Sequence, residues 1–423
     1  MINGNNSYWQ NASMNIRKDE DEWRLAKDTV SNTYTPEDEG KVVDNGTLVA
    51  QTSMPDEVTE NGTIDTTLYN SVTVNVSGGS STGNDVIFYD YDGTVAASYS
   101  ATDFADLSAM PENPTHTGLT GQGWNWSLSD AKAYVASYGK LNIGQMYITD
   151  DDKTRFYIEV SNYSRTIQLS LMLEPDSEID VDWGDGSAHT SWTYDDGDNF
   201  EGTHEYASAG KYVIAVTVVS GDLVLLSDHI KEQLYKVELG SGVLDINDES
   251  FENCYHLLSI TIPDYIVDFG SSIFQGCCAL RSITIPKSAK NIKVAAFYEC
   301  YTLQSISLPN SVTNFYSSAF SNCYSLSSIT IPNSVKGLFN AFNHCYSLSS
   351  ITIPNSVTSI DSNIFTDCYA LQSITFTTST PPELSGDLGI EKTCIIRVPQ
   401  GSLSAYTSAS NYPDPSQYIY EEY

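Results

Sequence analysis

The chain has 423 residues, of which 40% are hydrophobic, and its formal net charge is −34. The length predicts about three domains of roughly 150 residues, and the charge excludes nucleic acid and anionic lipid as favourable partners because both are also negative. No apolar run is long enough to span a membrane. The first residues lack an apolar core after a basic stretch, so we expect no secretory signal peptide and synthesis in a cytoplasm.

The first predicted unit covers residues 1–84 and is polar. We expect a short helix over 18–30, and short strands within 34–53 and 58–76, where Asn61-Gly62 is a turn signal. The Gly/Ser-rich residues at the end of this unit, 77–84, have the composition of a flexible linker.

Residues 85–150 are predicted to form a small α+β domain that begins with a strand. Two serines, Ser100 and Ser127, each stand three residues before an aspartate, which predicts the N-terminus of a helix. Gly139 predicts the end of the second helix. The bulky residues of GWNW (123–126) are expected to fill the core between the helices.

One segment of this domain has a possible enzymatic interpretation. Residues 90–94, DYDGT, resemble the first motif of haloacid-dehalogenase-like phosphatases. The resemblance implies that Asp90 attacks phosphorus and Asp92 transfers a proton. That fold needs a larger α/β domain, and the acidic residues and lysine of 150–153 stand too close together and in the wrong order. We therefore interpret the motif as a strand followed by a tight Asp-Gly turn, with the phosphatase as a remote alternative.

Residues 151–230 show the alternation of an antiparallel β-sandwich. The motifs Trp183-Gly184-Asp185-Gly186, His204-x-Tyr206 and Gly210-x-Tyr212-x-Ile214 resemble a PKD-type immunoglobulin-like domain. The resemblance implies a spacer or adhesive module in which His204 is structural. An acidic cluster in this unit is a candidate Ca²⁺ site, although its spacing is incomplete and a solvated loop is the alternative. Its members are Asp180, Asp182, Asp185, Asp195, Asp196 and Asp198.

From residue 231 to 380 the sequence repeats with a period of 23, shortened once to 22 within residues 334–342. Each copy follows F-x-x-C-x-x-L-x-S-I-x-I-P-x-x-V-x-x-I, and the period predicts a leucine-rich-repeat solenoid. Each S-I-x-I-P is expected to form a short strand with both isoleucines inward. Residues 151–230 should cover the first rung and residues 381–423 the last, because solenoid ends need caps. The repeat positions are Phe251, Cys254, Phe274, Cys277, Phe297, Cys300, Phe320, Cys323, Phe342, Cys345, Phe365 and Cys368.

The repeated cysteines place one thiol on each rung. Zinc sites need pairs two to four residues apart, so we interpret the thiols as a column of small buried side chains. Disulfides are not expected in a reducing compartment. Apart from the candidate Ca²⁺ site, no cofactor is predicted.

A tyrosine follows the cysteine in five copies, and only Cys278 interrupts this series. If the cysteine points inward, the next residue should lean outward, and exposed aromatic rings suit sugar rings or a flat protein epitope. The alternative is that the rings pack on one another and cover the edge of the solenoid. The candidate ligand-binding residues are Tyr255, Tyr301, Tyr324, Tyr346 and Tyr369.

The repeats and the tail after Phe376 resemble the BspA-like leucine-rich repeats of bacterial surface proteins. The whole layout resembles virion proteins of phages of gut Firmicutes, through residues 34–53, residues 58–76, the domain at 85–150, the PKD-like motifs and the repeats. That resemblance implies a mainly β, multidomain, non-enzymatic fibre, decoration or tail-associated protein. Its N-terminal segment would attach to capsid or tail proteins and its repeats would bind host-cell or mucosal glycans or proteins. A bacterial cell-surface adhesin is the alternative, and a homo-oligomer is compatible with either.

Overall fold

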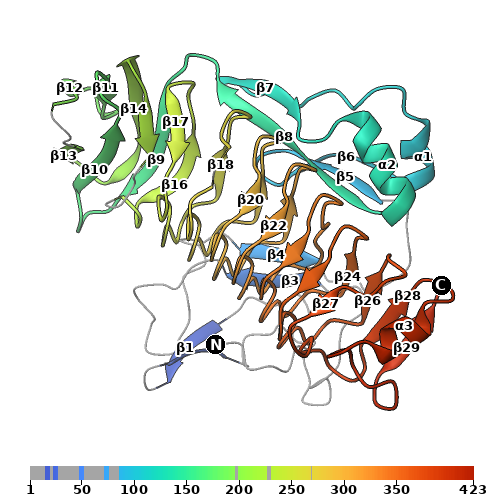
Figure 1. Cartoon of the computed structure of the whole chain (residues 1–423). Coiled ribbons are helices and arrows are strands. Elements are labelled where there is room, and N and C mark those ends of the chain that lie inside the picture. The colour runs from blue at the N-terminus through green and yellow to red at the C-terminus, as the bar shows by residue number, and fades with distance from the viewer. Residues whose placement is uncertain are drawn as a thin grey trace.

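The computed structural model describes residues 85–195, 199–225, 230–267 and 269–423, and the backbone of four strands before them. Within these ranges the chain is mainly β (Figure 1). The four N-terminal strands are β1 (Asn15–Asp19), β2 (Glu22–Ala26), β3 (Thr47–Gln51) and β4 (Ser71–Asn75).

The N-terminal strands form two antiparallel pairs, β1 with β2 and β3 with β4. The strand β2 shows that the helix predicted over residues 18–30 was wrong. A short isolated helix must first form a costly nucleus, whereas pairing with β1 satisfies backbone groups of both segments. The strands β3 and β4 lie where strands were predicted. The turn at Asn61-Gly62 and the linker at 77–84 lie outside the described residues.

The α+β domain has a four-stranded sheet in the order β6-β5-β8-β7 with two helices against it. Both helix starts were predicted correctly: the Ser100 and Ser127 hydroxyls accept hydrogen bonds from the backbone N–H groups of Asp103 and Asp130, at 3.0 and 3.1 Å. The elements are β5 (Val86–Tyr89), β6 (Val95–Tyr99), α1 (Ala101–Asp106), β7 (Leu119–Trp124), α2 (Leu128–Tyr138) and β8 (Leu141–Thr149).

Gly139 ends α2 with φ of 82°, as expected of a residue that must enter the left-handed region. Trp124 and Trp126 are buried, which confirms that GWNW supplies bulky core residues. The aromatic ring of Trp126 packs against Tyr134 of α2, with 5.4 Å between the ring centroids.

The next unit is a β-sandwich, as its alternation predicted. One sheet has the order β13-β10-β15 and the other the order β12-β11-β14-β9. The strands are β9 (Thr154–Val160), β10 (Thr166–Leu173), β11 (Glu178–Asp182), β12 (Thr190–Thr193), β13 (Phe200–Glu205), β14 (Gly210–Ser220) and β15 (Leu223–Leu225).

Both sheets of the sandwich continue into the solenoid. β9 pairs with β16 (Leu234–Glu238), and β15 pairs with β17 (Val243–Ile246). The strand β16 in turn pairs in parallel with β18 (Ser259–Thr261) of the next rung. The sandwich therefore covers the first rung, as predicted, and shares one hydrophobic core with the repeats.

The solenoid stacks parallel strands in which each residue lies beside its equivalent in the next repeat, for example Ile351 beside Ile374. The isoleucines of S-I-x-I are buried, as predicted. The strands are β19 (Ser282–Thr284), β20 (Asn291–Ile292), β21 (Ser305–Ser307), β22 (Asn314–Phe315), β23 (Gly337–Leu338), β24 (Ser350–Ile353), β25 (Ser359–Ile360), β26 (Ser373–Phe376) and β27 (Glu383–Leu384).

The one shortened repeat loses its residue in a turn. Phe315 pairs with Leu338, a spacing of one full repeat, and the next phenylalanines, Phe320 and Phe342, are one residue closer. The deletion therefore falls between residues 338 and 342, as the sequence predicted, and both flanking strands keep their partners.

The repeated phenylalanines and cysteines stack in the core along the segment that links the strands of one rung to those of the next. Successive rings of the repeated phenylalanines stack with centroids 5.4 to 6.0 Å apart. In the five repeats from Cys277 onward, the thiol of the repeated cysteine donates to the carbonyl of the phenylalanine on the preceding rung, at 3.1 to 3.2 Å. The extra Cys278 lies instead 3.8 Å from the Glu299 carbonyl. None of the eight cysteines, all of which lie in the described ranges, forms a disulfide. The sequence did not reveal that the thiols also satisfy backbone carbonyls.

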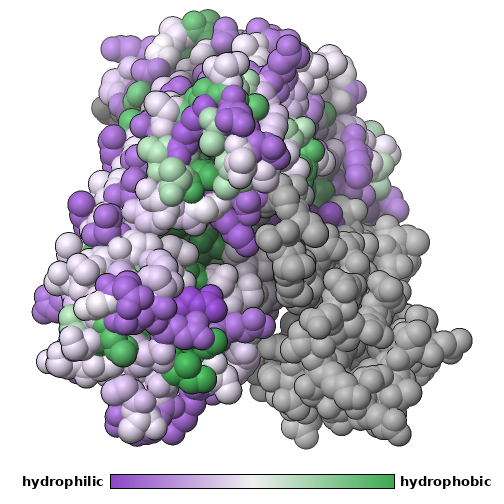
Figure 2. All heavy atoms as spheres, turned by 90° about the vertical axis from the view of Figure 1, so that its right-hand side faces the viewer, coloured by the Kyte–Doolittle hydropathy of each residue, from purple (hydrophilic) through white to green (hydrophobic). Residues whose placement is uncertain are grey.

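The C-terminal residues close the last rung. β28 (Ile395–Val398) and β29 (Ile419–Glu422) extend the strand sheet, and α3 (Leu403–Ser408) places Tyr406 against Phe376 at 5.1 Å. The parallel strand stacks thus continue into residues 381–423, where a separate cap was predicted. Hydrophobic residues at this end form small separate patches among polar ones (Figure 2).

Candidate functional site

The α+β domain lies against the strand side of the solenoid, along which β8 and α2 run (Figure 1). Asn125 donates to the carbonyls of Ile285 and Ser307, at 2.9 and 3.2 Å. The Trp126 indole N–H donates to the Leu308 carbonyl at 2.8 Å. The Tyr134 hydroxyl donates to Ile331, also at 2.8 Å. The domain is thus anchored to backbone groups of three successive rungs.

This contact removes part of the strand side from solvent. Outward-facing hydroxyl residues of the first strands are buried beneath the domain, among them Thr261, Thr284 and Ser307. Gly144 of β8 lies so close to the Thr284 side chain that no larger residue fits there. The equivalent residues of later rungs, Thr330 and Thr352, are half-buried. Over the early rungs, the α+β domain therefore blocks the access of a large partner to the strand side.

The tyrosines at the corner of the repeat stay outside this contact. We call Tyr255, Tyr301, Tyr324, Tyr346 and Tyr369 the tyrosine ridge. Before each of their cysteines, one residue adopts the left-handed conformation, with φ between 59° and 63°. This reverses the chain so that the cysteine enters the core and the tyrosine points outward. The predicted inward and outward directions are confirmed, since all five cysteines are buried and no ridge tyrosine is.

Four ridge rings stack on one another. Ring centroids are 4.7 Å apart for Tyr301 and Tyr324, 4.5 Å for Tyr324 and Tyr346, and 5.6 Å for Tyr346 and Tyr369. Four of the five rings therefore pack on one another, as the predicted alternative described. Inner rings therefore present edges and hydroxyls, while free ring faces remain at the ends, where Tyr255 is 42% and Tyr369 41% exposed.

The ridge hydroxyls are neutral donors at physiological pH. Burial raises the pKa of Tyr301, Tyr324 and Tyr346 above its ordinary value. The Tyr369 hydroxyl donates to the Asp367 carboxylate at 2.8 Å, and this bond, with partial burial, raises its pKa to about 12. The ridge can therefore offer hydrogen bonds to acceptors such as sugar hydroxyls and peptide carbonyls.

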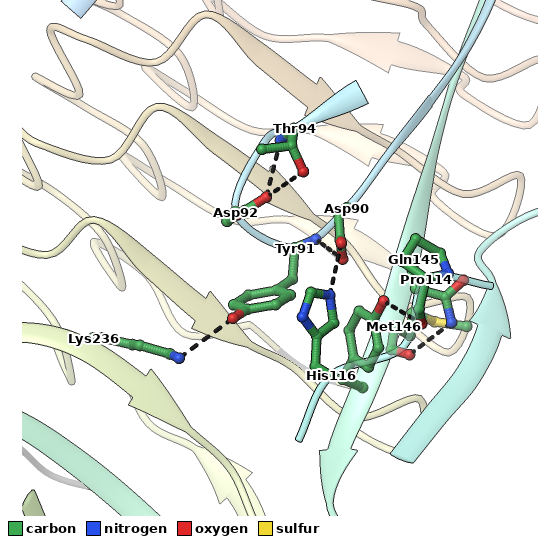
Figure 3. A network of polar contacts seen from close by, with 10 residues as sticks. Asp90, Tyr91, Asp92, Thr94, Pro114, His116, Gln145, Met146 and Lys236 are labelled. Carbon is green, nitrogen blue, oxygen red and sulfur yellow. Dashed lines mark hydrogen bonds and ion pairs between the residues drawn. The ribbon is translucent and has the colours of Figure 1, made fainter. Parts of the chain in front are cut away.

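The candidate phosphatase motif forms a tight turn between β5 and β6. The Asp90 carboxylate is buried and bonds to the Tyr91 N–H at 2.8 Å and to His116 Nε2 at 2.7 Å (Figure 3). Asp92 accepts from the N–H and hydroxyl of Thr94, at 2.9 and 2.7 Å. Gly93 has φ of 84°. The Asp92 carboxylate thus stabilises the turn, and the Asp90 carboxylate bonds to the turn and to His116. This agrees with the strand-and-turn interpretation.

The same network joins the α+β domain to the first rung. The rings of Tyr91, His116 and Tyr147 meet edge to face, with centroids 5.1 to 5.4 Å apart. Lys236 of β16 lies 3.3 Å from the Tyr91 hydroxyl and pairs with Glu238 at 2.8 Å. Sequence reasoning missed this junction because its members are far apart in the chain and match no motif.

The two parts of the PKD-like pattern meet in the sandwich. His204 stacks on Trp183 with 5.0 Å between ring centroids and bonds to Asp185 at 2.8 Å, while the Tyr206 hydroxyl donates to the Trp183 carbonyl at 2.8 Å. His204 is therefore structural, as predicted. Bonds from Ser187 and His204 lower the pKa of Asp185 to about 2. The assignment to a PKD-type domain stays a prediction.

Two of the candidate Ca²⁺ ligands lie against the His189 ring, whose Nε2 is 3.5 Å from the Asp182 carboxylate. Asp180 bonds to His189 at 2.7 Å, and Asp182 accepts from the Gly184 N–H at 2.9 Å. Among the described residues, no three histidine, cysteine, aspartate or glutamate side chains gather as metal ligands do. Asp196 and Asp198 lie outside those residues, so the calcium site stays a prediction.

Comparison with known proteins identifies the repeats. Residues 230–340 and 338–382 match, in six copies, the family described as BspA type leucine rich repeat region. This part of the chain is therefore a BspA-type leucine-rich-repeat solenoid. No curated protein matches the chain. None of the helices in the described ranges is long and apolar enough to cross a bilayer.

Three solved structures are similar to the chain over less than half its length. A leucine-rich-repeat protein of T. pallidum is 22% identical, with 46% of this chain and 83% of that one covered and a TM-score of 0.30. One from Bacteroides ovatus is 21% identical, with 44% and 66% covered and a TM-score of 0.22. A leucine rich cell surface protein from Faecalibacterium prausnitzii is 22% identical, with 45% and 61% covered and a TM-score of 0.25.

Proposed function

We propose that the chain is a non-enzymatic binding protein that displays its repeats at an exposed biological surface and binds host-cell or mucosal glycans or proteins through the tyrosine ridge. The observation that carries this proposal is the contrast between two sides of the solenoid. The α+β domain buries hydroxyl residues on the strand side of the early rungs. The ridge, repeated on five rungs, stays open to a partner.

The chemistry of the ridge suits a long, polar partner. Neutral phenol hydroxyls recur on successive rungs from Tyr301 to Tyr369, and Tyr255 and Tyr369 are the most exposed rings of the ridge. Hydroxyl donors can bind glycan or peptide oxygens, and ring faces can pack on sugar rings or apolar side chains. Many weak contacts on successive rungs add in affinity when one partner spans them.

Two placements agree with this binding role. In the first, the chain is a virion surface protein of a phage, either a head fibre, a decoration protein or a tail-associated adhesin, attached through its N-terminal segment to capsid or tail proteins. The resemblance of residues 34–53 and 58–76 to such proteins favours it. In the second, the chain is a bacterial cell-surface adhesin, which the BspA-type repeats favour equally. Quantitative mass spectrometry of purified particles and of washed cells separates the two.

Binding through the ridge is tested with the full chain and two variants. Tyr346→Ser breaks the stack at an inner rung, and we expect it to reduce retention of the chain on immobilised mucin and on washed host bacteria. Tyr163→Ser is the matched control, because Tyr163 is 98% exposed and lies in the sandwich. Equal retention of the two variants at matched thermal stability would show that the ridge is not the binding surface.

A further inference from the structure

The sheet formed by β20, β22, β23, β25 and β27 carries positive charge in an otherwise acidic chain. Residues 269–360 contain five lysines and arginines and a single acidic residue, Glu299, whereas the whole chain has a net charge of −34. Lys290 and Lys293 flank β20, and Lys336 precedes β23. A local surface of opposite sign attracts anions that the molecule as a whole would repel.

Backbone hydrogen bonds place these lysines on neighbouring rungs. The Thr313 N–H donates to the Lys290 carbonyl, and the Lys336 N–H donates to the Thr313 carbonyl, both at 2.8 Å. Lys290 and Lys336 are therefore two rungs apart, roughly 10 Å for a strand spacing of about 4.8 Å. Both are exposed and Lys293 is half-buried, while Ile292 of the same strand lies in the core. The three ammonium groups are thus open to solvent on one side of the solenoid.

The chain's own carboxylates do not neutralise these three lysines. Within the described ranges no aspartate or glutamate forms an ion pair with them, whereas Lys287 on the preceding turn pairs with Asp264 at 2.9 Å. Acidic residues occur in equivalent strands on both sides, with Asp245 in β17 and Asp361 directly after β25. The unpaired positive charge is therefore confined to the rungs of β20, β22 and β23.

Aromatic rings and a hydroxyl group lie beside the lysines. Tyr316 follows β22 as Lys293 follows β20, and its ring, 39% exposed, packs on Phe339 with 6.0 Å between ring centroids. A Cβ at Gly337 would collide with the Phe339 ring, which therefore lies against the backbone of β23. The Thr313 hydroxyl is on the rung between the two exposed lysines. We call this surface the lysine face, made of Lys290, Lys293, Thr313, Tyr316, Lys336 and Phe339.

We propose that the lysine face binds a sulfated polysaccharide, with sulfate groups at the lysines and sugar rings against Tyr316 and Phe339. An aromatic ring can pack on a sugar ring, and a hydroxyl can bond to sugar oxygens. A lysine ammonium is a compact charge with rotatable donors, whereas the planar carboxylate is matched best by arginine, which the face lacks. The site lies on a different part of the rung from the tyrosine ridge and does not depend on it.

The same surface fits nucleic acid poorly. Duplex DNA carries one negative charge per about 1.7 Å of its axis, which three lysines cannot neutralise beside a chain of net charge −34. A sulfated polysaccharide separates its charges by neutral rings. The lysine face likewise separates its two exposed lysines by a rung that carries a threonine and a tyrosine.

Three polymers with one backbone test the ligand chemistry: dextran sulfate, carboxymethyl-dextran of matched charge density, and unmodified dextran. Binding of the full chain to each immobilised polymer is measured by biolayer interferometry at low salt, where exposed charges are screened least. We expect dextran sulfate to bind about tenfold more tightly than dextran and about threefold more tightly than carboxymethyl-dextran. Equal affinity for the two charged polymers would overturn the assignment to sulfate. Tighter binding of a single-stranded oligonucleotide would overturn the assignment to a polysaccharide.

Charge variants test the location. Lys290→Gln/Lys336→Gln should weaken binding to dextran sulfate about tenfold, because two exposed ion pairs are lost. The matched control, Lys140→Gln/Lys211→Gln, changes the net charge equally at exposed positions outside the solenoid. An equal loss in the control would show attraction to the chain as a whole and overturn the proposal.

A ring variant separates sugar packing from charge attraction. Tyr316→Leu keeps every charge and should weaken binding to dextran sulfate about threefold; unchanged affinity would overturn the contact with sugar rings. Tyr346→Ser alters the tyrosine ridge and should bind dextran sulfate as the wild type does. A loss in that variant would place the site on the ridge and contradict the proposal, so the lysine face and the ridge can fail separately.

Discussion

Replacement of Asn125 tests whether the α+β domain is held on the solenoid by the contacts described. Asn125 is buried and makes four hydrogen bonds: it donates to the Ile285 and Ser307 carbonyls and accepts from the Gly144 N–H at 3.0 Å and the Ser307 hydroxyl at 3.1 Å. In Asn125→Ala the Gly144 N–H and two carbonyls lose these partners. A buried group left unpaired costs about 1–3 kcal/mol.

We expect Asn125→Ala to lower the free energy of unfolding by about 2–4 kcal/mol, and Tm by roughly 3–6 °C for a cooperative unit of this size. Asn125→Asp should cost more, because a carboxylate cannot donate to the Ile285 and Ser307 carbonyls and is itself buried. Urea unfolding followed by circular dichroism measures both variants. The matched control is Asn113→Ala, at an exposed position of the same domain. A loss within about 0.5 kcal/mol of the control for Asn125→Ala would refute the anchoring role.

Three further changes test other parts of the account. Ala295→Gly should raise the free energy of unfolding in urea by about 0.5–1 kcal/mol, because Ala295 has φ of 52° and glycine adopts this region without strain; an unchanged midpoint would contradict this. Cys323→Ala should lower it by about 1–2 kcal/mol through loss of the thiol bond to Phe297 and of packing, and a neutral result would contradict a stabilising role of either. Because the pKa of Asp185 is lowered to about 2, its contribution to stability is complete above its ordinary pKa near 4 and is lost as pH falls towards 2; Asp185→Asn should flatten thermal stability across that interval, and an unchanged slope would count against it.

The repeats were predictable because one physical pattern recurs. A rung that presents phenylalanine, cysteine, leucine and isoleucine inward must stack on an equivalent rung, so the period fixes both the neighbours and the side-chain directions. The position of the single deletion followed from the same regularity. Helix starts at Ser100 and Ser127 were predictable because a capping serine acts within three residues.

The parts that were not predicted depend on contacts between distant residues. The α+β domain binds the solenoid mainly through backbone carbonyls, such as those of Ile285 and Leu308. Because every residue has a backbone carbonyl, the residue types at these positions do not reveal the contact. Asp90 and His116 are 26 positions apart and form their hydrogen bond only after folding. The strand Glu22–Ala26 replaced a predicted helix because its partner, Asn15–Asp19, supplies the hydrogen bonds.

The ridge was predicted in position but not in geometry. The sequence showed which tyrosines share a corner, whereas the stacking of four rings required ring orientations. This difference changes the expected chemistry. Inner rings such as Tyr324 offer hydroxyls and edges, while ring faces are free only where the stack ends or is interrupted.

Hydroxyl-radical footprinting of the full chain, with and without solubilised mucin or host-cell envelope extract, tests most directly whether the ridge is the binding surface. Tyrosine rings are oxidised according to their exposure, and Tyr163 in the sandwich, at 98% exposure, is an internal reference. The account predicts that a partner protects Tyr255, Tyr369 and the tyrosines between them, with oxidation of Tyr163 unchanged. Protection of Tyr163 or of the α+β domain, with the ridge oxidised as in the free chain, would contradict it.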